Sequence, residues 1–540
     1  MVSGPRLLPF IATIGFLGIG LCIAARAANR QAQYVVEYPF GCDTFGYLRM
    51  ARQVREAPVT PWLANYHLEY DQSKWLVKAL KEAEIPAEDW HELVAPHAHH
   101  YFPKADAVGP QYPPGTGFIL AAFPEGQALS GLNASALVMQ WVIGIGVLFL
   151  AAWKKAWLAA VCVSLATVYG FVILGKIDVL SFSINAMIVP VLLAIVFTNL
   201  SNRSPDSSWQ RGVFAFVAGA LLGLATLIRL PIVFLAPGLA ILLLPRSWRG
   251  FRFRNAIREP VVMFSIGLLC FGIGLTMWHQ HRVAGAWYLS TYGVADTGTP
   301  SLKYVAVNAS FYMFQGSAMA IGHTLLAAFA IVLAATLRQK RVLLAIVVTW
   351  GISTVYFLTH RVTTPYYLIP STFATLWLIA LNLISTKRAS SLTFPAPARI
   401  VRALAFLGLS SLFIFFVGHL HRSAPHATFD QLSPRQIPTE FQQGQPWIWA
   451  DMASGTINYY GNVPTFKITF SNRETRHFVY SFAFASGEPQ FLVLDCPSME
   501  DIADEIRSMG GRLEHRGEAV SFSYYLIHWP STGPIWVPKP

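Results

Sequence analysis

The sequence has little charge and few cysteines for its length. Only 13% of its 540 residues are charged, whereas soluble domains usually carry about 25%, and this scarcity excludes an ordinary soluble enzyme. Five cysteines in so long a chain are too few for a framework of disulfides. Carboxylates are scarcest between residues 126 and 429, where only four occur: Asp178, Asp206, Glu259 and Asp296.

Apolar residues take the place of the missing charge. They make up 54% of the chain, and the mean hydropathy of +0.44 is typical of a polytopic membrane protein with some water-facing mass. The net charge of +12 does not indicate a nucleic-acid-binding protein, because the basic residues lie in short loops between apolar runs. We therefore expect membrane lipids, and no nucleic acid, among the partners.

Eleven apolar runs approach the roughly 20 residues that cross about 30 Å of hydrocarbon. The predicted fold is an α-helical polytopic membrane protein with about eleven transmembrane helices. The runs are residues 7–26, 131–152, 156–174, 180–200, 212–228, 231–245, 260–278, 316–336, 342–358, 366–386 and 403–420.

Basic residues gather in the loops on one side of these runs, as they do in cytoplasmic loops. They are Lys154, Lys155, Arg203, Arg211, Arg246, Arg249, Arg252, Arg254, Arg258, Arg338, Lys340, Arg341, Lys387, Arg388, Arg399 and Arg402. The alternation predicts a first transmembrane helix over 1–27 and an extracytoplasmic first loop with amphipathic helices over 28–130. A transmembrane bundle follows over 131–420, and then an extracytoplasmic α/β domain over 421–540. We expect a multi-pass protein of a cell membrane, with the bacterial inner membrane favoured. The start of the chain also resembles a cleavable signal peptide, which leaves the first loop outside in either case.

The C-terminal segment has the pattern of a small α/β domain. Runs of aromatic and β-branched residues predict strands, and a helical pattern lies between the last two, which predicts a βαβ-like unit. The predicted strands are 447–450, 466–470, 478–484, 490–495 and 522–528, and the predicted helix is 498–509.

Residues 41–52 read Gly-Cys-Asp-Thr-Phe-Gly-Tyr-Leu-Arg-Met-Ala-Arg and follow closely on the first apolar run. Their spacing predicts an amphipathic helix on the outer membrane surface with Asp43 at its start. A carboxylate beside lipid is partly desolvated, and this suits it to accept a proton from a hydroxyl. Asp is also a favoured helix N-cap, and spacing alone leaves both roles open.

Three other stretches fall on the same predicted outer side. Residues 111–117 contain Tyr112 and then paired prolines, which predict the start of a helix. Arg229 ends an apolar run in the sequence Leu-Ile-Arg-Leu-Pro, where a guanidinium suits a bound phosphate or reaches the lipid headgroups. His360 and Arg361 begin an aromatic turn that ends in Tyr-Tyr-Leu-Ile-Pro.

Together the four stretches resemble the GT-C superfamily of integral-membrane glycosyltransferases, and most of all its protein O-mannosyltransferase and aminoarabinose transferase branch. That branch has an acidic residue and a Tyr-x-x-x-Ala-Arg-like helix after the first span, and then a Pro-Pro element. An Arg-Pro element in mid-chain and a late outer Arg followed by Tyr-Leu-x-Pro complete the pattern. Residues 454–461 resemble a further short element of these relatives. The likeness covers the chain by topology and a small part of it by motif.

The resemblance implies transfer of a sugar from a polyprenyl-phosphate donor to an extracytoplasmic lipid, glycan or protein acceptor, with inversion. Asp43 would be the catalytic general base, and no residue is assigned as a metal ligand, although a divalent metal ion stays open as a cofactor. The residues that the resemblance implies for substrate binding are Tyr47, Tyr112, Arg229, His360, Arg361 and Asp178.

The sequence departs from this pattern at several positions. Gly46 stands where aminoarabinose transferases have an Arg three residues after the acid, and Tyr112 stands where a Lys is frequent. Leu230 splits the Arg-Pro element, and Asp178 is the best candidate for a second acid in an outer loop. These differences bear on the donor and its phosphate ligands more than on the fold.

Other interpretations stay open. A secondary transporter has a similar size, but transporters usually show internal repeats and charged groups near the midplane. A catalytically inactive scaffold of the same fold is a further alternative.

In the first loop, a histidine cluster fits no firm zinc spacing, and Cys42 and Cys496 have the positions to pair in an oxidising compartment. The histidines are His91, His97, His99 and His100.

Overall fold

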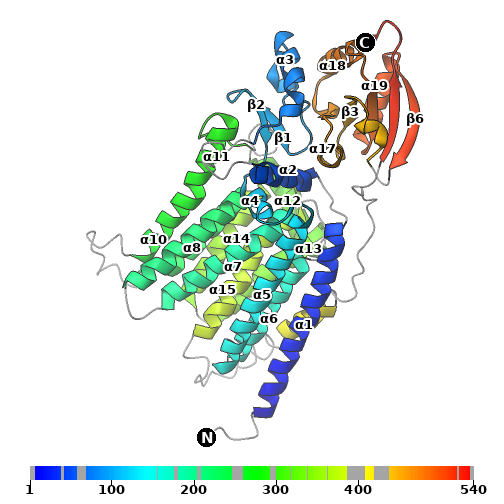
Figure 1. The fold of residues 1–540 in the computed structure, drawn as a ribbon. Coiled ribbons are helices and arrows are strands. Elements are labelled where there is room, and N and C mark those ends of the chain that lie inside the picture. Colours follow the sequence, from blue (N-terminus) through cyan, green and yellow to red (C-terminus); the bar gives the residue numbers. More distant parts are fainter. Residues whose placement is uncertain are drawn as a thin grey trace.

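The computed structural model is mainly helical and has a small sheet at one end (Figure 1). Nine helical stretches in its described ranges are long and apolar enough to cross a membrane. The predicted fold class, a polytopic helical membrane protein with a small α/β C-terminal region, is confirmed. The ranges that the structure describes are residues 7–37, 42–56, 68–154, 156–174, 181–203, 208–245, 259–291, 300–316, 318–336, 339–361, 363–385, 408–418, 437–519 and 522–535.

The membrane helices form a bundle whose axes run in roughly one direction (Figure 1). The stretch Pro260–Ala284 is continuous, with a π-helical segment at Leu269–Gly274 between its two α-helices. The helices are α1 (Leu7–Glu37), α5 (Ala128–Trp153), α6 (Trp157–Leu174), α7 (Ser181–Arg203), α8 (Ser208–Ile228), α10 (Pro260–Leu268), α11 (Leu275–Ala284), α13 (Ala318–Thr336), α14 (Lys340–Leu358) and α15 (Ile369–Ser385).

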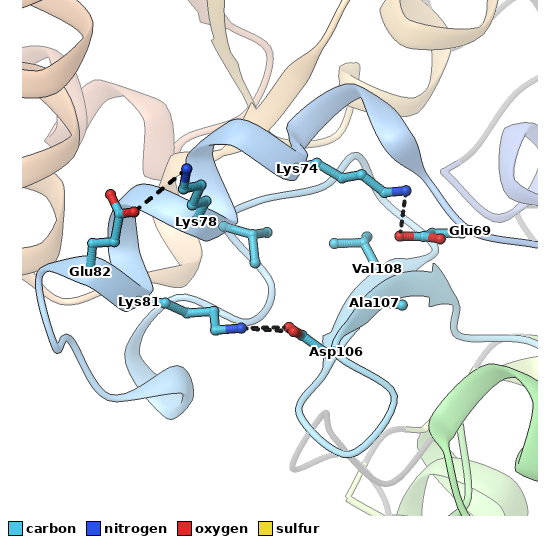
Figure 2. A pocket seen from close by; sticks show the side chains of 9 residues that line it. Glu69, Lys74, Lys78, Lys81, Glu82, Asp106, Ala107 and Val108 are labelled. Carbon is cyan, nitrogen blue, oxygen red and sulfur yellow. Dashed lines mark hydrogen bonds and ion pairs between the residues drawn. The ribbon is translucent and has the colours of Figure 1, made fainter.

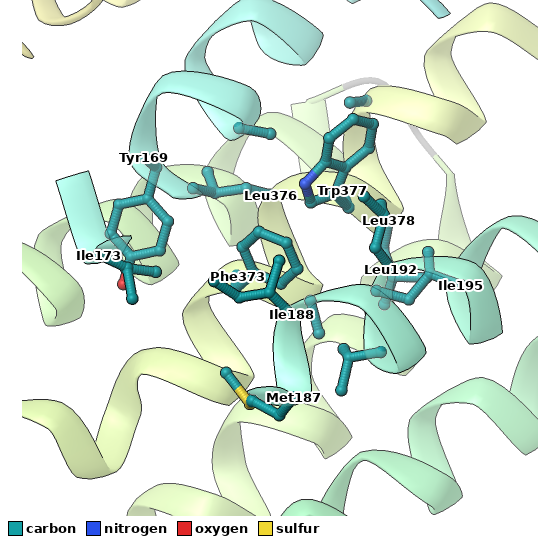
Figure 3. Close-up of a cluster of buried hydrophobic side chains, with 14 of the residues drawn as sticks. Tyr169, Ile173, Met187, Ile188, Leu192, Ile195, Phe373, Leu376, Trp377 and Leu378 are labelled. Atoms are coloured by element: carbon teal, nitrogen blue, oxygen red, sulfur yellow. The ribbon is translucent and has the colours of Figure 1, made fainter. Parts of the chain in front are cut away.

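Three helices make the centre of the bundle. The side chains of α6, α7 and α15 interdigitate there, among them Tyr169, Met187, Phe373 and Trp377 (Figure 3). In α6 83% of the span is buried, whereas only 17% is buried in Pro260–Ala284. Because a lipid-facing helix needs no protein partner for its apolar side chains, the peripheral spans are apolar all round and still exposed.

The predicted span 231–245 is shorter than expected. Its first residues form a 3₁₀ helix, η5 (Leu230–Leu235), and only Ala236–Leu243 (α9) is α-helical. Pro231 and Pro237 explain the difference, because proline supplies no backbone donor and restricts the preceding residue. The run 403–420 is described only as the short helix Gly408–Gly418.

The first loop and the C-terminal region lie at the same end of the bundle (Figure 1). Helix α2 lies across that end, as expected of an amphipathic interfacial helix. A two-stranded antiparallel sheet follows it in the first loop. Much later in the chain, the short helix η11 (Pro365–Leu368) leads into α15. The elements of the loop are α2 (Cys42–Glu56), α3 (Lys74–Glu82), β1 (His99–Phe102), β2 (Ala107–Pro110) and α4 (Gly115–Ala121).

The C-terminal region has a five-stranded sheet in the order β4-β3-β5-β7-β6. Strand β3 is parallel to β4 and β5, and β7 is antiparallel to β5 and β6. The bounds are β3 (Trp447–Ala450), α17 (Ser454–Gly461), β4 (Thr465–Lys467), α18 (Arg473–Ala485), β5 (Gln490–Leu494), α19 (Ser498–Ser508), β6 (Arg512–Ala519) and β7 (Phe522–His528).

Three details of the predicted domain were wrong. The predicted strand 478–484 lies in helix α18, where Asn472 caps the first turn by accepting from the Thr475 amide. Strand β6 was not predicted, because it is a charged edge strand without an apolar face. Since β6 and β7 form a hairpin, β7 returns antiparallel to β5, and no parallel βαβ unit forms there.

The first loop and the C-terminal region share one hydrophobic core. The ring of Trp75 lies 4.4 Å from that of Trp447, edge to face. The Lys467 amide donates to the Leu93 carbonyl at 3.0 Å. Two segments far apart in the sequence therefore pack as one water-facing unit above the bundle. Cys496 in this unit is a free thiol.

Candidate active site

Asp43 lies in the first turn of α2 and is only 4% exposed. The hydroxyl of Tyr112 donates a hydrogen bond to its Oδ1 atom. The Tyr47 ring, one turn further along α2, packs against the Tyr112 ring with 5.2 Å between their centres. Asp43 is thus at the expected end of the bundle, and it is buried against Tyr112, whose ring packs on that of Tyr47.

The paired prolines bring this group against α8. Helix α4 begins at Gly115, directly after Pro113 and Pro114. A Cβ atom on Gly115 would lie 2.7 Å from the backbone of Leu227 and Ile228, so only glycine allows this approach. The residue that follows Ile228 is Arg229, and the second motif therefore packs directly beside the third.

Arg229 stands in an extended conformation between α8 and η5. Its Nη1 atom lies 3.4 Å from the Ser183 hydroxyl, and its guanidinium carbon lies 5.9 Å from the centre of the Tyr367 ring. Because Gly115, close after Tyr112, packs on Ile228, Arg229 lies at the same end of the bundle as the Asp43–Tyr112 pair. The structure thus brings the two predicted groups to one end of the bundle.

In the fourth stretch, the rings of His360 and Tyr367 pack at the site, whereas the Arg361 side chain does not. The His360 ring is 5.4 Å from the Tyr367 ring, and the Asn308 amide donates to the His360 carbonyl at 2.7 Å. Arg361 is exposed. Asp178 lies outside the described residues. Sequence reasoning did not select Tyr367 or Ser183, although Tyr367 belongs to the Tyr-Leu-x-Pro run that carried the resemblance.

Gly46 explains one departure from the family pattern. A Cβ atom there would lie 2.3 Å from the Cβ of Ala98, a buried residue with a φ of 72°. The first loop therefore occupies the space that a larger side chain would need. An arginine at this position therefore has no room.

Gly46→Ala is expected to lower the free energy of unfolding by about 1–3 kcal/mol, because overpacking a close contact displaces the backbone. Thermal unfolding of the purified protein, followed by tryptophan fluorescence, measures this change. Gly126→Ala is the matched control, since no atom lies within 4 Å of a Cβ there. Equal melting temperatures for the two variants would show that the Ala98 contact is not tight.

The four histidines of the first loop have separate surroundings. His97 Nε2 lies 2.8 Å from Asp451 Oδ1, and burial lowers the pKa of His97. Burial also lowers the pKa of His99 and of His100 to about 3. Within the ranges given above, no three His, Cys, Asp or Glu side chains converge as metal ligands. These histidines therefore do not fit a shared metal ion.

Acid is expected to destabilise this water-facing unit. Between pH 6.5 and 3 the unfolded chain protonates His99 and His100 but the folded chain does not. Since the unfolded state then binds more protons, the free energy of unfolding decreases as the pH is lowered, by about 1.4 kcal/mol for each pH unit and each histidine. Melting temperatures between pH 7.5 and 5 measure this loss.

The histidine variants test the assignment. His100→Gln is expected to weaken the pH dependence, and His515→Gln, at an exposed position, is expected to leave it unchanged. A melting temperature that is constant over this range of pH would contradict buried neutral histidines.

A hollow of about 530 Å³ lies on the first loop between α3 and β2 (Figure 2). Its lysines are each paired with an acid: Lys74 with Glu69 at 3.0 Å, Lys78 with Glu82 at 3.7 Å and Lys81 with Asp106 at 2.8 Å. Because these pairs are largely exposed to water and no aromatic ring among the described residues lines the hollow, it has the character of a solvated surface.

No protein-family model matches the sequence, and a search of curated proteins gives no match. Among solved structures, ArnT from Cupriavidus metallidurans in the apo state is similar, with 15% identity over 85% of this chain and 94% of its own, and a TM-score of 0.47. The same protein bound to undecaprenyl phosphate gives 16% identity over the same shares of both chains and a TM-score of 0.42.

An oligosaccharyltransferase from Archaeoglobus fulgidus, tethered with an acceptor peptide, is 10% identical over 94% of this chain and 74% of its own, with a TM-score of 0.44. ArnT and the archaeal enzyme are GT-C membrane glycosyltransferases, the superfamily that the sequence motifs resemble. The likeness is distant, and it specifies neither a donor nor an acceptor for this chain.

Proposed function

We propose that this protein is a membrane glycosyltransferase that moves a sugar from a polyprenyl-phosphate donor to an extracytoplasmic lipid, glycan or protein. The observation that carries the proposal is the buried Asp43–Tyr112 pair, which lies at the same end of the bundle as Arg229. An acid and a cation at one end of the bundle suit a reaction that deprotonates a nucleophile and releases an anion.

In the proposed step the acceptor hydroxyl oxygen attacks the anomeric carbon of the sugar, and the bond from that carbon to the phosphate oxygen breaks. The electron pair leaves with the polyprenyl phosphate, and Asp43 takes the hydroxyl proton. Because attack and departure occur on opposite faces, the sugar is inverted.

The other residues have supporting roles in this proposal. Tyr112 orients the carboxylate, and Tyr47 holds Tyr112 in place. Arg229 stabilises the charge that develops on the leaving phosphate. His360 fixes the Tyr367 ring, and Arg361 contributes a more distant positive charge at the phosphate. Asp178 stays a prediction as the second acid.

We also propose that the protein resides in a bacterial inner membrane, with the first loop (28–130) and the C-terminal domain (421–540) in the extracytoplasmic space. Undecaprenyl phosphate, the ligand in one ArnT structure, belongs to the class of carrier that the proposed reaction releases. A sugar carried by a lipid is the donor that this location requires, since nucleotide sugars are cytoplasmic.

Deletion of the gene tests the function directly. A strain without the protein is expected to accumulate one sugar-charged polyprenyl phosphate and to lose one surface glycan or glycolipid structure. Mass spectrometry of lipid extracts measures the carrier, and a plasmid copy of the gene restores both. Unchanged amounts of every charged carrier in the deletion strain would contradict the proposal.

A further inference from the structure

A second hollow, of about 450 Å³, lies where α2 meets the C-terminal domain. Helix α17 stands beside α2 there, away from the membrane bundle (Figure 1). The volume is within the range of roughly 300–1,000 Å³ that is typical of sites for small ligands. The residues that line the hollow are Arg49, Arg52, Gln53, Glu56, Glu125, Tyr459, Tyr460 and Asn462.

One face of α2 forms a wall of this hollow. Arg52 and Gln53 lie three and four residues after Arg49, and Glu56 lies four and three residues after them, a spacing that puts these side chains on one face of a helix. Phe45 continues this face and packs against the rings of Tyr459 and Tyr460, 6.0 and 5.6 Å between centres. The two walls are therefore held together by an aromatic contact next to the hollow.

The charged groups of the hollow are fixed by their neighbours. Arg52 Nε donates to Glu125 Oε1 at 2.7 Å, and its guanidinium carbon lies 4.3 Å from the centre of the Tyr459 ring. Arg49 donates to the Asn458 amide oxygen and stacks on Tyr70 at 4.5 Å. Arg49 and Arg52 are balanced in number by Glu56 and Glu125, so the lining has no net charge.

This chemistry favours a sugar. Guanidinium, carboxylate and amide groups are planar and offer paired donors and acceptors, which match neighbouring hydroxyls on a pyranose ring. The half-buried Tyr460 ring supplies an aromatic surface for the apolar face of such a ring. A lining without net charge gives no preference for an anion, and its many polar groups disfavour an apolar ligand.

We propose that this hollow binds a neutral saccharide unit of the acceptor, so that the acceptor is a glycan. The proposal rests on the proposed transferase function. Arg49 follows Asp43 by six residues, which is about 9 Å along the helix axis and a rotation of about 240° around it. Asp43 and the hollow therefore lie on different faces of α2, and an acceptor that reaches both must be at least two units long.

Saturation-transfer NMR on the full-length protein in lipid nanodiscs tests the proposal. Maltoside detergents are avoided, because their head groups are themselves sugars. The probes are maltotriose, cellotriose, mannotriose and chitotriose at millimolar concentration, with trigalacturonate as the acidic comparison. At least one neutral trisaccharide is expected to receive magnetisation from the protein, which reports binding. Tyr460→Ala is expected to weaken its binding about tenfold, whereas Tyr460→Phe keeps the ring and is expected to change it little.

Tyr288→Ala is the matched control, since Tyr288 is an exposed aromatic residue outside the hollow. If Tyr460→Ala lowers the melting temperature, Arg52→Gln on the opposite wall is used as the test variant. It is expected to weaken trisaccharide binding several-fold. The proposal is overturned if no neutral probe receives saturation transfer. It is also overturned if Tyr460→Ala and Arg52→Gln bind the trisaccharide as tightly as the wild type. Tighter binding of trigalacturonate than of every neutral probe overturns the neutral assignment.

Asp43→Asn separates this proposal from the proposed function, because it is expected to bind the trisaccharide as the wild type does. Binding without any effect of Asp43→Asn on sugar transfer would reject the catalytic assignment and leave the saccharide site in place. Loss of transfer in Asp43→Asn, with no trisaccharide bound by the wild type, would reject the saccharide site alone.

Discussion

Replacement of Asp43 by asparagine is expected to reduce sugar transfer by about 10²–10⁴-fold, the range that removal of a general base usually costs. The amide keeps the shape of the side chain, and its oxygen still accepts from Tyr112. The fold is therefore expected to survive while the proton acceptor is lost. The measurement is the sugar-charged carrier that accumulates in a deletion strain complemented with this variant.

Asp504→Asn is the matched control, because Asp504 is an exposed acid in the C-terminal domain that pairs only with Arg507 among the described contacts. It is expected to restore the wild-type carrier level. Immunoblots of membrane fractions must show equal amounts of both proteins. Restoration by Asp43→Asn at an equal level would remove Asp43 from the mechanism.

Arg229→Gln is expected to lower kcat by about 10²–10³-fold, as loss of one preorganised donor to a developing oxyanion does. Arg229→Lys keeps the charge but not the planar fork, so its loss is expected to be smaller. Rates come from release of polyprenyl phosphate by purified protein in nanodiscs, once the accumulated carrier of the deletion strain is available as substrate.

Arg361→Gln is the comparison for this prediction. Both arginines were candidates from the sequence, but Arg229 contacts Ser183 and faces Tyr367, whereas Arg361 is exposed. The structure therefore ranks them, and Arg361→Gln is expected to lose less than tenfold, mainly in KM. A larger loss for Arg361→Gln than for Arg229→Gln would reverse the assignment of the phosphate ligand.

The membrane part of the fold could be predicted from hydropathy, because long apolar runs have few alternatives to spanning helices. Hydropathy failed at 231–245, where two prolines decide the local geometry. In the C-terminal domain, aromatic residues at 478–484 suggested a strand. In the structure, Thr475, Val479 and Ala483 are buried at intervals of four residues. This spacing is typical of a helix and not of the alternation in a strand.

From the sequence, Asp43, Tyr112 and Arg229 could be expected at one end of the bundle, but the contact between Asp43 and Tyr112 could not be predicted. Tyr112 lies 69 residues after Asp43, and no local pattern indicates that its hydroxyl reaches that carboxylate. In the sequence, Gly46 was only a departure from the family pattern. Its role appears when Ala98 is seen against it.

The shared core of the first loop and the C-terminal domain has a consequence for biosynthesis. Trp90 emerges from the ribosome about 360 residues before its partners around Trp449, an interval of about 20–70 s at ordinary translation rates. During that time the apolar surface of the loop lacks its C-terminal partner, while the helices between the two are still being synthesised. The shared core can therefore close only after the last of these helices has been made.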